Sequence, residues 1–358
     1  MIKAIIRYNE FRFRRPTITS RGILLKKPVY FILLYDSSVP FTYGIGECTL
    51  FPGLSMDDVA GFHKKIQEIT ELINKGWFNL KTPLYSYPSI SFAIETAMKD
   101  LEQKGSKILY PSLFTEGKDS ITINGLIWMG TAHEMNIQID QKLKLGFHCL
   151  KLKIGSLDFD EEYEIISNLR KRYKREDLEI RLDANGAFHP EDALEYLYRL
   201  SDLDIHSIEQ PILPSQLDEM AALCETSPLP IALDEELIGK YPLENKLQLL
   251  KMINPKYIVL KPGLLGGINP CEEWIEVANE LKIGWWITSS LETNIGLNAI
   301  AQWTYLYKNF SAQGLSTGTL FVNNIESPLA LQGEKLYYFP QKKWDLSMFF
   351  QNDQPHAK

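Results

Sequence analysis

Short apolar runs alternate with longer amphipathic stretches over most of this chain. From about Ile121 the helical stretches, such as Asp160 to Arg175, separate eight apolar runs, at 121–127, 148–154, 178–183, 205–209, 230–234, 257–261, 284–288 and 311–315. Strands of a parallel sheet are covered on both faces and are therefore apolar throughout. Eight strand–helix steps in about 200 residues favour a closed parallel barrel over an open sheet. The pattern therefore predicts an α/β fold.

The region before residue 121 has a different pattern. Val29–Tyr35 is typical of a strand, and a turn at 36–38 follows it. Ser55, with acidic residues directly after it, predicts the start of a helix. A second helix is expected from about Ser89 to Lys104, where apolar residues recur at helical spacing. We expect a separate α+β segment here, and the alternation is lost again from about Phe321.

Five charged residues stand at the ends of consecutive apolar runs. They are Lys153, Asp183, Glu209, Asp234 and Lys261, and the gaps between them are 30, 26, 25 and 27 residues. One strand, one helix and two short loops together take roughly 25 to 30 residues. The five side chains are therefore expected at the C-terminal ends of neighbouring barrel strands, where active sites of such barrels lie.

The alternation of side chains along a strand predicts that these charges point into the barrel. In the 148–154 run, Leu150, Leu152 and Ile154 share one face, and Lys151 and Lys153 share the other. The apolar face must contact the surrounding helices, so both lysines face inward. In the other four runs too, Asp183, Glu209, Asp234 and Lys261 lie on the face opposite to the apolar residues that contact the helices. Charges placed there are costly unless they are paired or bind a metal ion.

Three carboxylates that converge on one point repel one another unless a cation lies between them. Oxygen ligands from separate strands suit Mg²⁺, and Mn²⁺ is a substitute that such ligands also accept. Zinc would favour His or Cys, and no histidine lies at these strand ends. A bound divalent cation can hold a substrate carboxylate and stabilise the enediolate that forms when the α-proton is removed. Lys153 and Lys261, on opposite sides of the barrel, can address the two faces of one substrate.

Composition narrows the class of protein. The chain has 358 residues, 45% of them hydrophobic, and a net charge of −7, which argues against a nucleic-acid partner. No apolar run reaches the roughly 18 residues of a membrane span, and residues 1–7 are too short an apolar stretch for a signal peptide. Four scattered cysteines form no CxxC pair, so we expect reduced thiols and a cytoplasmic protein. The sequence leaves the oligomeric state open.

The motifs at these positions resemble those of the enolase superfamily, in its muconate-lactonising subgroup. They are Lys151-Leu152-Lys153, Asp183-Ala184-Asn185, Glu209-Gln210-Pro211, Asp234-Glu235 and Lys261-Pro262-Gly263. The resemblance implies a (β/α)7β TIM-like barrel over residues 119–320. It also implies an α+β capping domain over 1–118, on which the tail 321–358 packs. Lys153 and Lys261 would be catalytic, and Asp183, Glu209 and Asp234 would bind Mg²⁺.

Within the subgroup, the loops resemble most those of the o-succinylbenzoate synthase family. The resemblance rests on Ser289-Ser290-Leu291-Glu292-Thr293, on Gln313-Gly314-Leu315-Ser316-Thr317 and on Arg181. It implies syn dehydration of 2-succinyl-6-hydroxy-2,4-cyclohexadiene-1-carboxylate in menaquinone biosynthesis, a hydro-lyase reaction. Lys153 would remove the α-proton and then protonate the departing hydroxyl, while Lys261 would stay charged and stabilise the enediolate. The candidate substrate-binding residues are Lys151, Arg181, Asn185, Ser289, Ser290 and Gly314. The alternative for Arg181 is a pair with a nearby carboxylate, and the alternative for Ser289 and Ser290 is ordinary helix capping.

Other reactions on the same machinery stay open. N-acylamino acid racemases, dipeptide epimerases and muconate-type cycloisomerases resemble this chain in both lysines and all three acidic residues. Dipeptide epimerases carry an Asp-x-Asp after the eighth strand, where this chain has Ser316-Thr317-Gly318. Without that carboxylate pair, a substrate α-ammonium group would lack its partner. A non-catalytic metal-binding barrel is the alternative from another class. Phe51, Pro52 and Leu54 are expected to form a lid over the barrel mouth.

Overall fold

The computed structural model describes residues 1–19, 22–39, 41–79, 84–309 and 311–350. Its N-terminal part is an antiparallel sheet with two helices, as the sequence predicts. The strands pair in the order β1–β2–β3, and α2 packs on β3. The elements are β1 (Ile2–Thr19), β2 (Gly22–Asp36), β3 (Gly44–Cys48), α1 (Phe62–Asn74) and α2 (Pro88–Glu102).

The prediction that a helix starts at Ser55 is wrong, because α1 begins at Phe62. The Ser55 hydroxyl accepts a hydrogen bond from the Phe51 backbone N–H at 2.8 Å, and Asp58 accepts one from Gly53 at 2.8 Å. These polar side chains stabilise turns in the loop before the helix. Serine and aspartate favour such turns as well as the start of a helix, which is why the sequence suggested a helix here.

Two glycines let α2 lie close to β3. A Cβ atom at Gly46 would lie 1.8 Å from the backbone oxygen of Ala93, and one at Gly44 would lie 2.0 Å from that of Ala97. No larger residue fits at either position. The close contact brings Glu47, the next residue of β3, to a buried position against the second half of the molecule.

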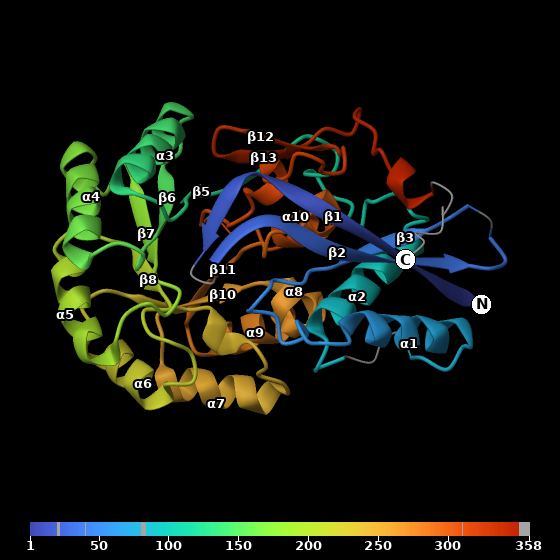
Figure 1. Ribbon diagram of the computed structural model, residues 1–358, viewed down its shortest axis with the longest axis horizontal. Helices are drawn as coiled ribbons and strands as arrows, with labels where there is room; N and C mark the ends of the chain where they lie inside the picture. The colour runs from blue at the N-terminus through green and yellow to red at the C-terminus, as the bar shows by residue number, and fades with distance from the viewer. Residues whose placement is uncertain (20–21, 40, 80–83, 310, 351–358) are drawn as a thin grey trace.

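The second half is an α/β unit with a curved parallel sheet, which confirms the predicted fold class at this level. Seven strands pair in the order β11–β10–β9–β8–β7–β6–β5, and α3 to α7 lie along the outer side of the sheet (Figure 1). The strands are β5 (Gly125–Ile127), β6 (Cys149–Lys153), β7 (Glu179–Asp183), β8 (Ser207–Glu209), β9 (Ile231–Leu233), β10 (Tyr257–Leu260) and β11 (Gly284–Ile287). The helices are α3 (Ala132–Lys144), α4 (Phe159–Arg172), α5 (Pro190–Ser201), α6 (Leu217–Thr226), α7 (Leu243–Ile253), α8 (Pro262–Leu265), α9 (Ile268–Glu280) and α10 (Asn294–Leu306).

The expected eighth run, 311–315, contains paired residues but no continuous strand. Gly314 forms a parallel bridge to Thr288, and Gln313 forms one to Ile123. Gly314 donates to the Ile287 carbonyl at 2.8 Å, and Gln313 donates to the Thr122 carbonyl at 2.9 Å. Backbone hydrogen bonds therefore continue from β11, across residues 313 and 314, to the segment that precedes β5.

The tail contacts both parts of the molecule. Strands β12 (Leu329–Gln332) and β13 (Lys335–Tyr338) pair with β4 (Ser120–Thr122) in the order β12–β13–β4. The rings of Phe321 and Phe349 pack on Phe13 and Phe31 of the N-terminal sheet, with centroids 4.8 and 4.9 Å apart. Residues 351–358 of the predicted tail lie outside the described residues. The division of the chain into domains at residue 118 stays a prediction.

Three apolar clusters hold these layers together. The largest fills the space between the parallel sheet and its helices, and a second lies between the N-terminal sheet and α1 and α2. The third joins the other face of the N-terminal sheet to the tail, to Leu291 in the loop after β11 and to Ile295 at the start of α10. The N-terminal sheet is thus packed directly against a loop at the carboxyl ends of the parallel strands.

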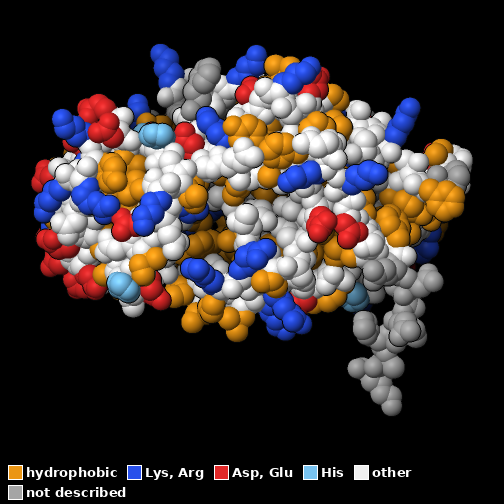
Figure 2. Space-filling model, turned by 90° about the horizontal axis from the view of Figure 1, so that it is seen from above, with side chains coloured by type: hydrophobic (Ala, Val, Ile, Leu, Met, Phe, Trp, Pro, Cys, Tyr) orange, Lys and Arg blue, Asp and Glu red, His pale blue; other side chains and the backbone are white. Residues whose placement is uncertain are grey.

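None of the described helices is long and apolar enough to cross a membrane. Lys and Arg side chains are spread over the face seen in Figure 2 and are interleaved with Asp and Glu.

Candidate active site

The parallel register brings the predicted charged residues to one end of the sheet. Lys151 and Lys153 lie on β6, Asp183 ends β7 and Glu209 ends β8. In the pairing, Lys153 lies beside Asp183, and Asp183 lies beside Glu209. Asp234 follows β9 directly, and Lys261 follows β10 directly. All five predicted strand-end charges, together with Lys151, therefore meet at the carboxyl end.

Lysine side chains stand between the carboxylates. Lys151 Nζ lies 2.7 Å from Asp183 Oδ2 and 2.6 Å from Glu209 Oε2. Lys153 Nζ lies 2.6 Å from the same oxygen, Asp183 Oδ2. Lys261 Nζ is bonded to Asp234 Oδ2 and lies 3.8 Å from Glu209 Oε1. The positive charge that the carboxylates require is supplied here by three ammonium groups.

Burial and the neighbouring charges shift the pKa values of Asp183, Lys151 and Lys261 in opposite directions. Burial alone would raise the pKa of Asp183, but Lys151 and Lys153 outweigh it and hold the pKa well below its usual range. Burial alone would lower the pKa of Lys151 and of Lys261, yet the neighbouring carboxylates raise both. Burial and the Asp183 carboxylate together raise the pKa of Glu209. Glu209 is therefore the carboxylate least compensated by its surroundings.

The donor set fits a divalent cation of the magnesium type. Both carboxylate oxygens of Glu209 are buried and lack a well-aligned hydrogen bond within the described part of the chain, although Lys151 lies near one of them. Among the described residues, no three acidic, His or Cys side chains already form a ligand cluster. The reason is that Lys151 lies between Asp183 and Glu209, and Lys261 between Glu209 and Asp234. Three carboxylates from adjacent strands are hard oxygen donors of the kind Mg²⁺ takes.

Two amide side chains connect the charged groups to the loops. Asn185 Oδ1 accepts from Lys153 at 2.7 Å, and its Nδ2 donates to Glu235 at 3.0 Å. Gln210 Oε1 accepts from the backbone N–H of Asp234 at 3.2 Å and of Glu236 at 3.3 Å. Asn185 and Gln210 both have positive φ, 46° and 42°. Such backbone is costly for residues other than glycine and is concentrated at functional sites.

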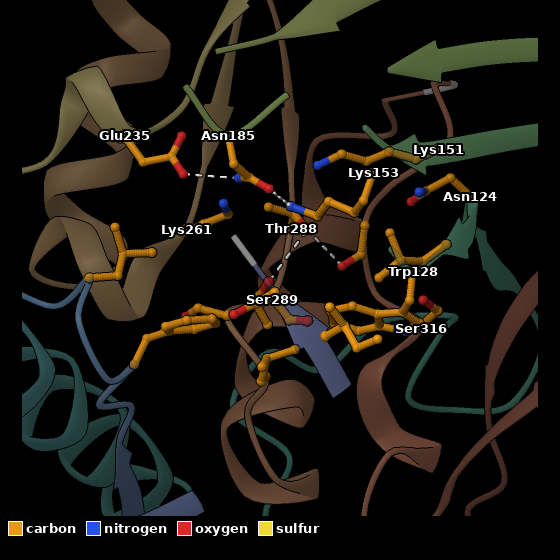
Figure 3. Close-up of a pocket in the computed structure, with 18 residues that line it drawn as sticks. Asn124, Trp128, Lys151, Lys153, Asn185, Glu235, Lys261, Thr288, Ser289 and Ser316 are labelled. Atoms are coloured by element: carbon orange, nitrogen blue, oxygen red, sulfur yellow. Dashed lines mark hydrogen bonds between the residues drawn. The ribbon is translucent and has the colours of Figure 1, made fainter. Parts of the chain in front are cut away.

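A pocket of about 750 Å³, including the part open to solvent, lies over these groups. It is lined by apolar residues of the N-terminal part, Ile18, Phe51 and Leu54, and by polar groups of the parallel unit (Figure 3). The predicted residues that line it are Lys151, Lys153, Asn185, Lys261, Ser289, Ser290 and Gly314, and Asp183, Glu209 and Asp234 are bonded to its lysines. The loop at Phe51 and Leu54 lies over the carboxyl end, where the sequence predicts a lid.

The structure gives Arg181 a different place from the one predicted. Its side chain is fully buried, does not line this pocket and stacks on Trp286 at 4.5 Å. Its guanidinium donates to Glu179 at 2.7 Å and to the Ala312 carbonyl at 2.9 Å. Arg181 lies two residues before Asp183 on the same face of the strand, so its side chain is one layer deeper in the sheet. There it contacts Glu179 and Ala312 and does not reach the pocket.

Several residues that line the pocket are not among those predicted from the sequence. Asn124, Leu126 and Trp128 come from β5 and its flanks, and Ile18 and Thr19 come from the far end of β1. The remaining ones are Glu235, Thr288, Leu291 and Ser316. The alternation of side chains along a strand was applied to the other runs but not to the run 121–127. Applied there, it identifies Asn124 and Leu126 as pocket residues, because both face inward. No local signal identifies Ile18 and Thr19, which reach the site only through the packing of two units.

The loop after β11 is held by buried charges from the N-terminal sheet. Lys27 of β2 donates to the backbone carbonyls of Ser290 at 3.2 Å and of Leu291 at 2.7 Å. Glu47 of β3 accepts from the backbone and hydroxyl of Thr293, which caps α10. Glu292 accepts from the backbone and hydroxyl of Ser290. The position of Ser289 and Ser290 in the pocket therefore depends on residues more than 240 positions away in the chain.

Comparisons with known proteins agree with this architecture. Residues 134–335 match the family described as enolase C-terminal domain-like. The chain is 43% identical to the o-succinylbenzoate synthase of Desulfotalea psychrophila, over 91% of this chain and 96% of that protein. It is 23% identical to the L-Ala-D/L-Glu epimerase of Bacillus subtilis, over 73% of this chain and 68% of that protein.

Solved structures show the same relationship. The crystal structure of MenC from Desulfotalea psychrophila superposes with a TM-score of 0.80 at 40% identity, over 94% of this chain and 99% of that one. The muconate lactonizing enzyme of Pseudomonas fluorescens superposes with a TM-score of 0.80 at 20% identity, over 98% and 97% of the two chains, and so shares the fold. The resemblance seen in the motifs is confirmed. The chain belongs to the enolase C-terminal domain-like family, within the enolase superfamily.

Proposed function

We propose that this chain is an o-succinylbenzoate synthase, a lyase that dehydrates 2-succinyl-6-hydroxy-2,4-cyclohexadiene-1-carboxylate to o-succinylbenzoate in menaquinone biosynthesis. The observation that carries the proposal is the 43% identity to the Desulfotalea psychrophila synthase over nearly the full length of both chains. The site supports it, because two lysines approach the same pocket from different strands, next to three carboxylates.

The architecture we propose is a (β/α)7β barrel over residues 119–320, with a capping domain formed by 1–118 and the tail. Gly314 bonds to β11 at one edge of the seven-stranded sheet, and Gln313 bonds to the segment directly before β5 at the other edge, which supports closure of the barrel. The pocket lining by Ile18 and Leu54 supports the capping role. The proposed location is the cytoplasm, in keeping with four free cysteines. The proposed partner is a small-molecule carboxylate, not a nucleic acid.

Asp183, Glu209 and Asp234 would hold Mg²⁺, or Mn²⁺ in its place. The bound ion would supply a fixed positive charge that makes the proton next to the substrate carboxylate more acidic. Occupation of the site requires Lys151 and Lys261 to release oxygens that they contact here. The buried and poorly bonded oxygens of Glu209 supply a reason for a cation to bind there.

Lys153 is the proposed base. Its Nζ faces the pocket, and Asp183 and Asn185 hold it at 2.6 and 2.7 Å. It takes the proton from the carbon next to the carboxylate and then returns a proton to the departing hydroxyl. Lys261, directly after the strand four places further along the sheet, stabilises from the other side the negative charge that develops on the substrate. Positively charged Lys261 agrees with its raised pKa, which the carboxylates around it maintain against burial.

The proposed substrate-binding residues are Lys151, Asn185, Ser289, Ser290 and Gly314, all of which line the pocket. Arg181 is better explained as a buried support of the sheet, given its contacts with Glu179 and Ala312.

The direct test is a spectroscopic assay of purified protein with Mg²⁺ and the cyclohexadiene substrate. We expect loss of the diene absorbance, with a rate that depends on Mg²⁺. Folded protein that binds Mg²⁺ and leaves the diene unchanged would refute the proposal. Exchange of the α-proton for deuterium in N-acylamino acids or dipeptides, measured alongside, would instead support a racemase or epimerase. The ratio of kcat/KM values decides between the two reactions.

A further inference from the structure

Asn124 is a buried polar side chain of the pocket that the proposed mechanism does not use. Asn124 is 2% exposed and lines the pocket. Within the described part of the chain, its side-chain oxygen Oδ1 accepts no hydrogen bond. A buried polar atom left without a hydrogen-bond partner destabilises the folded protein. Such an atom in the wall of a binding pocket indicates contact with a ligand.

The backbone around Asn124 is held in place by hydrogen bonds to two other segments. The Asn124 backbone N–H donates to the Gln313 carbonyl at 3.0 Å, and the Ile123 N–H donates to the Glu334 carbonyl at 2.8 Å. Leu126 and Trp128 continue the same inward face and also line the pocket. Figure 3 places Asn124 on the side of Trp128 and of the Lys151 and Lys153 stems, away from Glu235.

The chemistry of the unpaired atom selects one group of the substrate, if the proposed function holds. Oδ1 is a hydrogen-bond acceptor. At neutral pH the substrate carries two ionised carboxylates, a ketone and one hydroxyl. The hydroxyl is the only hydrogen-bond donor of these groups, and it is also the group that leaves.

We propose that Asn124 Oδ1 accepts a hydrogen bond from the leaving hydroxyl of the substrate and holds it on the Lys153 side of the ring. The electron pair of the α-C–H bond then forms the new ring double bond. The C–O bond breaks, its electron pair leaves with the oxygen, and that oxygen takes the proton carried by Lys153 and departs as water. Asn124 would thus determine that the substrate is a hydroxylated ring.

The test compares Asn124→Leu and the smaller Asn124→Ala with the wild type. Dehydration kinetics give kcat/KM, and calorimetry with Mg²⁺ present gives the Kd of o-succinylbenzoate, which lacks the hydroxyl. We expect kcat/KM to fall at least tenfold and the product Kd to change less than twofold. Retained product affinity also proves that the variant pocket is folded. Asn136→Leu is the matched control, because Asn136 is exposed on α3 and bonds only locally, to Ala132.

Two results would overturn the assignment. An unchanged kcat/KM would show that the amide does not contact the hydroxyl. A product Kd that weakens as much as kcat/KM falls would place the contact on a carboxylate or ketone that substrate and product share. Wild-type protein that binds o-succinylbenzoate without dehydrating the diene would instead refute the proposed function, so the two failures are distinguishable.

Discussion

The side-chain nitrogen of Lys27 lies 2.7 Å from the backbone oxygen of Leu291, which joins the N-terminal sheet to the loop that lines the pocket. Lys27 is 1% exposed, and its positive charge acts on the buried Glu47 and Glu292. Leu291 itself has a positive φ of 66°, a conformation that a leucine adopts only when its surroundings impose it. The contact therefore supports both the interface and the shape of the loop.

Replacement of Lys27 by Met keeps the length of the side chain and removes its charge. The carbonyls of Ser290 and Leu291 would lose their buried donor, a change that costs about 1–3 kcal/mol, and a positive charge that acts on Glu47 and Glu292 would be removed. We expect thermal unfolding at a clearly lower temperature, with a raised KM because the Ser289–Leu291 loop loses its support. Lys26→Met is the control, since the Lys26 side chain is exposed and bonds to Glu10. Equal stability of the two variants would contradict the role of Lys27.

Lys153→Ala should abolish turnover while Mg²⁺ still binds. A positioned acid–base group contributes about 10²–10⁴-fold to the rate, and Lys153 is proposed to act in both proton transfers. Rate assays and calorimetric titration with Mg²⁺ measure the two properties separately. The exposed Lys144→Ala on α3 serves as the control. Residual activity within threefold of the wild type would exclude Lys153 as the base.

Asp183→Asn should weaken Mg²⁺ binding before it affects the fold. The substitution removes one of three proposed anionic ligands but keeps the shape of the side chain. We expect the Kd for Mg²⁺ to rise at least tenfold, equivalent to ~1.4 kcal/mol. Titration calorimetry measures the Kd, and Asp192→Asn, at an exposed position on α5, is the control. Unchanged Mg²⁺ affinity would remove Asp183 from the metal site.

Glu95 gives a prediction for the pH dependence of stability. Its carboxylate accepts from the backbone N–H groups of Ile268 at 2.5 Å and Asn269 at 2.9 Å, at the start of α9. Burial raises its pKa from 4.5 to about 7, against the effect of those bonds. A raised carboxyl pKa means that the folded state binds the proton more tightly than the unfolded state does. Its contribution is therefore present below pH 4.5 and is lost as the pH rises to about 7.

The test measures the free energy of unfolding between pH 4.5 and 7.5 for the wild type and Glu95→Gln. Relative to the variant, the wild type should lose stability as the pH rises, by a few kcal/mol at most. Glu102→Gln, an exposed change on the same helix, should follow the wild type. Parallel curves for the wild type and Glu95→Gln would disprove the link to this carboxyl group.

The charged part of the site was predictable because strand parity and repeat length are local properties. Lys153, Asp183, Glu209, Asp234 and Lys261 each lie at the end of an apolar run, and parallel pairing brings such ends together whatever the loops do. Arg181 obeys the same parity but lies one layer deeper. The alternation along a strand predicts on which face of the sheet a side chain lies. It does not predict how far that side chain lies from the carboxyl end of the strand.

The rest of the site depends on packing between distant segments. Ile18 and Thr19 reach the pocket because a long hairpin of the N-terminal sheet extends over the parallel unit (Figure 1). No feature of the sequence distinguishes the buried Lys27 from a surface lysine, because its partners are backbone carbonyls more than 260 residues away. The eighth apolar run, 311–315, was expected to be a strand. Its composition could not show that, within this run, only Gln313 and Gly314 form bridges to neighbouring segments.

The pocket walls divide between two stretches of chain. Ile18, Thr19, Phe51 and Leu54 come from the N-terminal part, whereas every charged side chain that lines the pocket comes from the parallel unit. The apolar wall contributed by the N-terminal part and the charged wall are therefore encoded in separate segments of the gene. Changes at positions 18, 19, 51 and 54 can alter that apolar wall and leave every charged side chain of the pocket unaltered.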